Sequence, residues 1–189
     1  MIKSWQKIGG QTELAKRFGK SLYIQNFINH RGENVEWVFF KVQDFSMIMP
    51  VTENLEVVTV VQYRHGPDRI SHELPAGMLE SGTEEFSELA LRELEEETGY
   101  KVGEVIKLAS LPIHVQSSPT FCHLFLAINC KRVGQVHTDA NEEIEVKLVP
   151  LKNWIEKALR GDIKESWSCL ATFLAIKHLN EKMDLKLKI

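Results

Sequence analysis

The chain has 189 residues, of which 43% are hydrophobic and 26% are charged, and its formal net charge is −3. This composition predicts one globular domain over residues 1–189 with a real hydrophobic core, and it gives no sign of a nucleic-acid-binding surface. The three cysteines lack CxxC spacing, so we expect reduced thiols and not a disulfide framework. No apolar run reaches the roughly 18–20 residues of a membrane helix, and residues 1–10 lack a signal-like apolar stretch. We therefore expect a cytoplasmic protein without a membrane partner.

Hydrophobic patterning predicts a series of strands in the first part of the chain. The expected strands are 20–28, 34–42, 45–50, 55–64 and 73–77. The strand at 55–64 is rich in valine and is the best candidate for a central strand covered on both faces. Glycine, asparagine and proline at 30–34 and 66–68 are typical of turns.

A glutamate-rich helix that closes on Gly99 is expected next. Further strands are expected at 102–111, 121–129 and 144–150, and further helices at 151–159 and 166–179. The intervening segments 112–120 and 139–143 are expected to be loops. This order predicts an α+β sandwich, in which a mixed sheet carries at least one helix on each face.

The glutamates of the first helix are not evenly distributed around it. At about 100° per residue, its apolar stripe consists of Phe86, Leu89, Ala90 and Leu94. Glu93 and Glu97 fall inside this stripe and Glu96 falls at its edge, whereas the solvent side consists of Glu85, Glu88, Arg92 and Glu95. Inward carboxylates one turn apart repel each other and are costly to desolvate, and a hard divalent cation would resolve both problems. The alternative is an ordinary charged surface helix.

The residues around this helix resemble the signature of the Nudix hydrolase family. The matching residues are Gly77, Glu84, Arg92-Glu93-Leu94, Glu96-Glu97 and Gly99-Tyr100. The run RELEEETG at 92–99 matches without a gap. Six residues separate Gly77 from Glu84, so the loop is one residue longer than the family's usual spacing, which would place the glutamate at Thr83. The resemblance implies a Nudix fold, an α/β/α sandwich whose signature forms a loop, a helix and a loop.

The resemblance also implies a magnesium site, with manganese as a possible substitute. Glu93 and Glu97 would be ligands, Glu96 would be a ligand or support one, and the backbone carbonyl of Ala76 would complete the site. Arg92 would hold a glutamate in place by a charge-assisted hydrogen bond. Such ions neutralise a diphosphate and activate water for attack at phosphorus.

Other segments are similar to the ADP-ribose and nucleotide-sugar pyrophosphatase branch of the family. They include VVQYRH at 60–65 and ELPAG at 73–77. By this resemblance Arg64, Glu73 and Pro119 belong to the substrate site, with Arg64 near the diphosphate or ribose. A strand-end surface arginine and a plain loop proline are the alternatives. The acidic residues that commonly follow this proline in the branch are missing here.

In this branch a loop after the signature helix often supplies the general base. The acidic stretch 139–145 is its expected source, and we favour Glu142 or Glu143 over Glu145, which already belongs to a strand pattern. A solvated acidic turn is the alternative.

The branch also uses antiparallel N-terminal strands to contact a second subunit. Roughly residues 1–50 are therefore expected to form a strand extension, and the protein is expected to form a homodimer.

The resulting expectation is a magnesium-dependent pyrophosphohydrolase. Its substrates would be nucleoside diphosphate sugars such as ADP-ribose and ADP- or GDP-sugars, and its products a nucleoside monophosphate and a sugar phosphate. One rival is a Nudix hydrolase of nucleoside triphosphates or dinucleoside polyphosphates. The other is a non-catalytic, nucleotide-sensing Nudix domain, against which the intact run at 92–99 argues.

Overall fold

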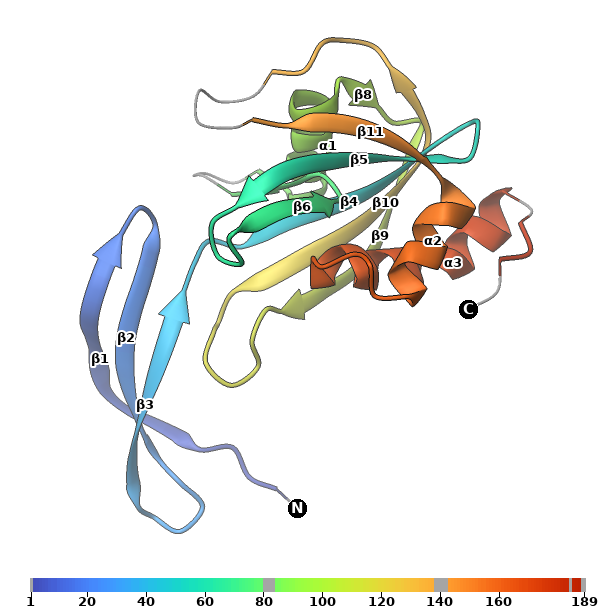
Figure 1. The fold of residues 1–189 in the computed structure, drawn as a ribbon. Coiled ribbons are helices and arrows are strands. Elements are labelled where there is room, and N and C mark those ends of the chain that lie inside the picture. The colour runs from blue at the N-terminus through green and yellow to red at the C-terminus, as the bar shows by residue number, and fades with distance from the viewer. Residues whose placement is uncertain (1, 80–83, 138–142, 184, 188–189) are drawn as a thin grey trace. The chain divides into compact units, whose positions relative to one another are not determined.

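The computed structural model describes residues 2–79, 84–137, 143–183 and 185–187 (Figure 1). The chain forms two compact units. We call residues 1–44 with 111–121 the strand unit, and residues 45–110 with 122–189 the sandwich unit. No helix of the described ranges is long and apolar enough to cross a membrane.

The strand unit is a three-stranded antiparallel sheet in the order β1 (Gln6–Arg17), β2 (Lys20–Ile28) and β3 (Asn34–Lys41). Phe18 and Gly19 join β1 to β2, and both have the positive φ that a two-residue hairpin turn requires. The predicted strands β2 and β3 are confirmed, but β1 was not predicted. Its residues are almost all exposed and its register shifts after Ile8, so the strand shows no alternating apolar pattern.

The sandwich unit is built on a mixed sheet of eight strands. Its main path runs β11-β5-β4-β10-β8, with β6 paired to β5, β7 to β4 and β9 to β10. The strands are β4 (Phe45–Thr52), β5 (Glu56–Arg64), β6 (Arg69–Glu73), β7 (Ala76–Met78), β8 (Tyr100–Lys101), β9 (Glu104–Pro112), β10 (Phe121–Arg132) and β11 (Glu145–Pro150). The β4–β10 pair is parallel. The valine-rich strand β5 is internal to the sheet, as predicted.

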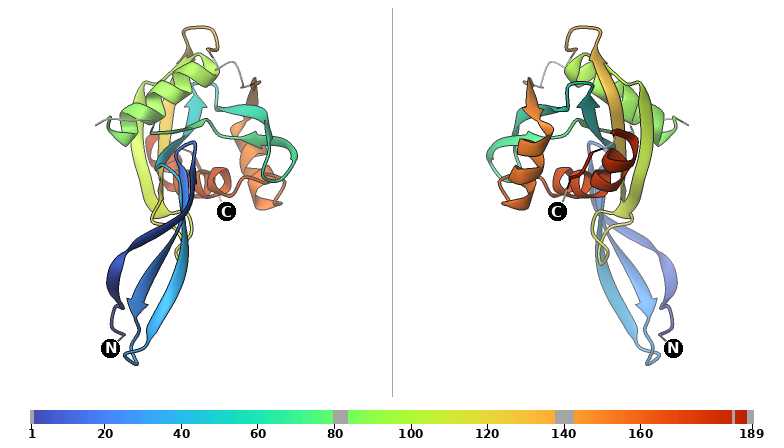
Figure 2. Two further views of the ribbon diagram at one scale, coloured as in Figure 1. Left: turned by 90° about the vertical axis from the view of Figure 1, so that its left-hand side faces the viewer. Right: turned by 90° about the vertical axis from the view of Figure 1, so that its right-hand side faces the viewer.

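Three helices complete the sandwich unit: α1 (Phe86–Thr98), α2 (Leu151–Leu159) and α3 (Ser166–Met183). Figure 2 shows α1 on one side of the sheet and the other two helices on the opposite side. Successive strand residues face opposite layers. Ile48 belongs to the core cluster beneath α1, whereas its neighbour Met47 contacts Ser168 of α3. The predicted α/β/α sandwich is therefore confirmed.

The segment before α1 differs from the predicted single strand at 73–77. The structure has two short strands, β6 and β7, separated by Leu74 and Pro75. Proline has no N–H to donate to a sheet ladder, and here its carbonyl oxygen accepts from the Ile48 N–H at 3.0 Å. Strand β6 was missed because its inward residues, Ser71 and Glu73, are polar and give no hydrophobic signal.

Candidate active site on helix α1

Helix α1 ends where the glycine pattern predicted. Gly99 has φ of 74° and donates its N–H to the Glu95 carbonyl at 2.8 Å, which closes the helix in the left-handed conformation that glycine favours. The Gly99 carbonyl accepts in turn from the N–H groups of Val133 and Gly134 at 2.9 and 3.2 Å. His137 donates its N–H to the Glu96 carbonyl at 2.8 Å. The segment 133–137 is thus bound to the C-terminal end of α1.

The carboxylates of α1 have different environments, as the helical wheel predicted. Glu97 is only 6% exposed and lies with Leu89, Ala90 and Leu94 on the buried side of the helix. The Glu93 side chain is 16% exposed, whereas that of Glu96 is 44% exposed. Two carboxylates one turn apart therefore point toward the sheet.

Strand β7 runs directly against these two carboxylates. The Ala76 N–H donates to Oε2 of Glu97 at 3.2 Å. A Cβ atom at Gly77 would overlap the Glu93 carboxyl group, so any other residue at this position would displace that side chain. The backbone of Ala76 and Gly77 and the side chains of Glu93 and Glu97 therefore form one polar cluster at the edge of the core.

This cluster suits a hard divalent cation. Magnesium prefers oxygen ligands and usually keeps several waters, so one or two carboxylates and a carbonyl are a sufficient protein contribution. Within the described ranges, no group of three or more histidine, cysteine, aspartate or glutamate side chains could hold a metal ion by itself. A cation here would therefore rely on the Glu93 and Glu97 carboxylates together with a backbone carbonyl and water.

Arg92 forms ion pairs with three glutamates on the exposed side of the site. Its guanidinium group lies 2.7 Å from Glu96, 3.0 Å from Glu93 and 3.3 Å from Glu84. Burial opposes the charge on Arg92, but the hydrogen bonds and charges of these three glutamates outweigh burial and raise its pKa above the ordinary value. Arg92 therefore holds the carboxylates in fixed positions. Glu84 reaches Arg92 despite the longer loop before it.

A second arginine lies at the end of β5. The Arg64 Nε and Nη2 atoms donate three hydrogen bonds of 2.6–3.1 Å to Glu73, whose carboxylate is almost fully buried. Burial opposes the charge on Arg64, but the hydrogen bonds to Glu73 and the charges of Glu73, Glu97 and Glu165 raise its pKa above the ordinary value. Arg64 and Glu73 are therefore brought together, on the same unit as α1.

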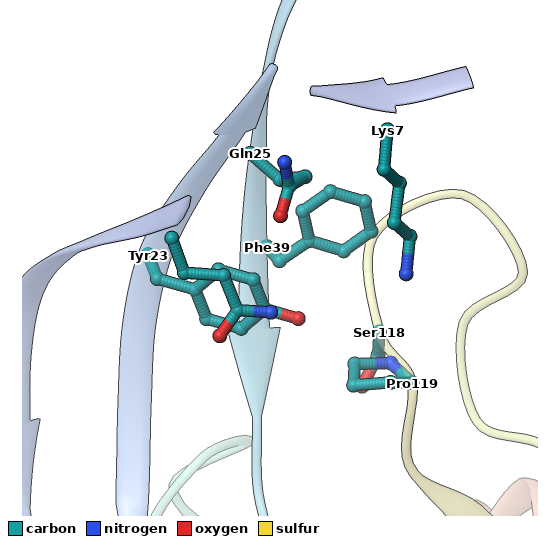
Figure 3. A pocket seen from close by; sticks show the side chains of 7 residues that line it. Lys7, Tyr23, Gln25, Phe39, Ser118 and Pro119 are labelled. Atoms are coloured by element: carbon teal, nitrogen blue, oxygen red, sulfur yellow. The ribbon is translucent and has the colours of Figure 1, made fainter. Parts of the chain in front are cut away.

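Pro119 belongs to the strand unit. With Ser118 it lines a small cavity of about 90 Å³, shown in Figure 3. The other lining residues are Lys7, Gln11, Tyr23, Gln25 and Phe39. Tyr23 and Phe39 stack on each other with their ring centroids 5.3 Å apart, so both rings are engaged within the sheet.

The predicted sources of a general base lie in the sequence just before β11 and at its first residue. Glu142 lies outside the described residues, and Glu143 is exposed. Glu145 opens β11, pairs with Val61 of β5 and lies 3.2 Å from Lys147. Sequence reasoning missed the attachment of segment 133–137 to α1, which is made by backbone hydrogen bonds alone.

The comparisons with known proteins agree with this architecture. The family model described as NUDIX domain matches residues 43–167. The chain is 28% identical over 166 residues to the ADP-ribose pyrophosphatase of Bacillus subtilis (strain 168), and this match covers 87% of each of the two chains. It is 30% identical over 142 residues to the methanol dehydrogenase activator of Bacillus methanolicus, covering 75% of this chain and 74% of that one. The chain therefore belongs to the NUDIX domain family and is a Nudix hydrolase.

A solved structure supports the fold independently. The crystal structure of an ADP compounds hydrolase superposes with a TM-score of 0.83 at 17% sequence identity. The match covers 98% of this chain and 99% of that chain. At this identity the similarity establishes a common fold.

Proposed function

We propose that the protein is a magnesium-dependent pyrophosphohydrolase of nucleoside diphosphate sugars, with ADP-ribose as the first substrate to test. The observation that carries the proposal is the pair of inward carboxylates, Glu93 and Glu97, packed against Ala76 and Gly77. The names of the relatives, an ADP-ribose pyrophosphatase and an ADP compounds hydrolase, support this substrate class.

In this proposal Glu93, Glu97 and the Ala76 carbonyl hold the cation, and Glu96 supports them through Arg92. Manganese, which accepts the same oxygen ligands, is expected to substitute for magnesium. When bound, the cation supplies positive charge for the diphosphate oxygens and activates the attacking water. Ala76 orients Glu97 by its N–H, and Arg92 keeps Glu93 and Glu96 in place.

Two further groups complete the proposed site. Arg64 carries a half-exposed guanidinium on the same unit and is proposed to bind the negatively charged diphosphate. The general base is proposed to be Glu142 or Glu143, which takes the proton from the attacking water. Segment 133–137, which precedes the acidic stretch in the sequence, is bound to α1 and supports this choice.

We also propose that the protein acts as a homodimer. The β2–β3 pair of the strand unit exposes Leu22, Val38 and Phe40, and cross-strand pairing places these residues on one face of the sheet. An apolar face of this kind favours association with a second copy. Light scattering at micromolar concentration should give twice the chain mass, and a monomeric mass would refute the dimer.

The experiment is a hydrolysis assay with magnesium on a panel of nucleotide sugars, triphosphates and dinucleoside polyphosphates. Wild type should convert ADP-ribose to AMP and ribose 5-phosphate. Glu97→Gln should lose at least about a hundredfold in kcat/KM, because a catalytic cation contributes several kcal/mol. Glu95→Gln is the matched control, since Glu95 lies on the same helix and pairs with Lys101 on its exposed side.

Three other results of this assay would change the proposal. Equal activity of Glu97→Gln and wild type would remove the metal assignment. Turnover of triphosphates or dinucleoside polyphosphates alone would replace nucleotide sugars as the substrate class. No turnover of any compound by wild type would point to a nucleotide-sensing role.

A further inference from the structure

The ion pair between Arg64 and Glu73 divides its two members between solvent and core. The Arg64 side chain is 42% exposed, whereas that of Glu73 is only 2% exposed. We propose that Glu73 is a positioning residue, which holds the Arg64 guanidinium in place for the substrate diphosphate without contacting the substrate itself. The inference rests on the proposed function, because it concerns the diphosphate group of that substrate class.

The hydrogen-bond geometry leaves Arg64 able to bind a second anion. Nε donates to both Glu73 oxygens at 3.1 and 2.9 Å, and Nη2 donates to Oε2 at 2.6 Å. This side-on contact uses the Nε edge of the guanidinium. The Arg64 guanidinium has five N–H donors in a fixed plane, so its Nη1 edge is directed away from Glu73. The N–H groups on that edge can therefore donate to another anion. A phosphate oxygen is the anion that this edge suits.

The backbone that carries Glu73 is itself held in place by hydrogen bonds. Glu73 pairs with Val60 in the β5–β6 ladder, and the N–H of the next residue, Leu74, donates to the Ser168 hydroxyl at 3.0 Å. Ser168 is fixed in turn, since its N–H donates to Glu165 at 2.6 Å in the first turn of α3. Glu73 therefore presents its two oxygens to Arg64 from a backbone that is anchored on both sides.

The same short segment also positions the proposed metal ligand. Three residues after Glu73, the Ala76 N–H binds Glu97. The segment 73–76 thus contacts both Arg64 and Glu97, and it sets where the cationic group lies relative to the carboxylates of α1. Glu97 and Glu165 also attract the Arg64 charge. Without Glu73, Arg64 is expected to move toward these carboxylates and to compete with the cation at Glu97.

Two kinetic consequences follow for Glu73→Gln. The KM for ADP-ribose should rise roughly tenfold with kcat changed by less than about threefold, because one charge-assisted contact that orients Arg64 is lost. The magnesium concentration for half-maximal activity should also rise, since Arg64 is free to approach Glu97. A purely structural role of Glu73 would lower the melting temperature without changing either constant.

The test combines Glu73→Gln with Arg64→Gln, the double variant and two comparison variants. If Glu73 acts through Arg64, the double variant should be no worse in kcat/KM than Arg64→Gln alone. Ser71→Ala, also buried on β6, controls for loss of a buried polar group and should leave KM unchanged. Arg64→Lys, which keeps Glu73 and the charge but loses the planar fork, should also raise KM and needs no change in the core.

The outcomes separate this inference from the proposed function. An unchanged KM in Glu73→Gln, or strictly additive effects in the double variant, would overturn the positioning role while wild type still cleaves ADP-ribose. An unchanged KM in Arg64→Lys would overturn it even if Glu73→Gln fails to fold. Absence of any diphosphate cleavage by wild type would overturn the proposed function, and the inference with it.

Discussion

The loss of stability on replacing Gly99, the glycine that ends α1, can be predicted closely because the chain provides a matched control for it. Gly99 and Gly161 have nearly equal positive φ angles of 74° and 70°. Alanine at either position therefore incurs the same left-handed backbone cost of about 1–2 kcal/mol. The two sites differ in their surroundings. A Cβ at Gly161 would meet nothing within 4 Å, whereas a Cβ at Gly99 would lie 2.5 Å from the carbonyl oxygen of Gly134.

The extra contact sets the size of the expected difference. To relieve it, segment 133–134 must move away from α1, which breaks the two hydrogen bonds that Val133 and Gly134 donate to Gly99. Each such bond contributes about 0.5–1.5 kcal/mol. Gly99→Ala should therefore reduce the free energy of unfolding by about 2–5 kcal/mol, against about 1–2 kcal/mol for Gly161→Ala.

Urea unfolding followed by tryptophan fluorescence and by circular dichroism measures both values, provided that the m-values agree. Gly134→Ala adds a second control, because a Cβ there would meet nothing within 4 Å and φ is not positive, so its stability should stay near that of wild type. A Gly99→Ala variant that is no less stable than Gly161→Ala would refute the contribution of segment 133–134 to this helix end.

Three further predictions concern the rest of the sandwich unit. Gly77→Ala should weaken manganese binding roughly tenfold or more in a calorimetric titration, because its Cβ displaces the Glu93 carboxylate. Gly66→Ala is the control: its Cβ would meet nothing within 4 Å, so it should bind manganese like wild type. Burial, followed by nearby lysine charges, lowers the pKa of His72. The contribution of neutral His72 to the free energy of unfolding is therefore present above about pH 6.5 and is lost as the pH falls toward the folded-state pKa. Between pH 7.5 and 5, urea unfolding should show a shallower decline in the free energy of unfolding for His72→Gln than for wild type. Equal slopes in the two proteins would contradict this. The partly exposed Cys169 should be the first thiol to react with Ellman's reagent, since the other two cysteines are buried; a fast phase that survives Cys169→Ala would contradict this.

Much of the fold could be predicted because several segments carry strong periodic signals. The valines of β5, the 3.6-residue pattern of α1 and the glycine after it each identify an element with little help from the rest of the chain. The helical wheel also placed Glu97 on the buried side, since burial of α1 follows its own apolar stripe. Helix α2 was predicted with its observed bounds at 151–159.

Other features depend on contacts that no local pattern reveals. Strand β1 is exposed and its register shifts, so its residues show no alternation. The pairing of Arg64 with Glu73 requires that β5 and β6 form a hairpin, which brings two residues nine positions apart into contact. The attachment of segment 133–137 to α1 joins parts of the chain more than thirty residues apart through backbone atoms alone. Backbone hydrogen bonds of this kind are independent of side-chain identity, and sequence reasoning cannot detect them.

Binding of a divalent cation by the inward carboxylates of α1 can be measured directly. Manganese should be titrated calorimetrically into wild type, Glu97→Gln and Glu95→Gln at one pH. Loss of a ligand carboxylate should weaken binding at least about tenfold in Glu97→Gln, and Glu95→Gln should match wild type because Glu95 faces Lys101 on the exposed side of the helix. Equal manganese affinity in all three proteins would contradict the assignment of Glu97 as a metal ligand.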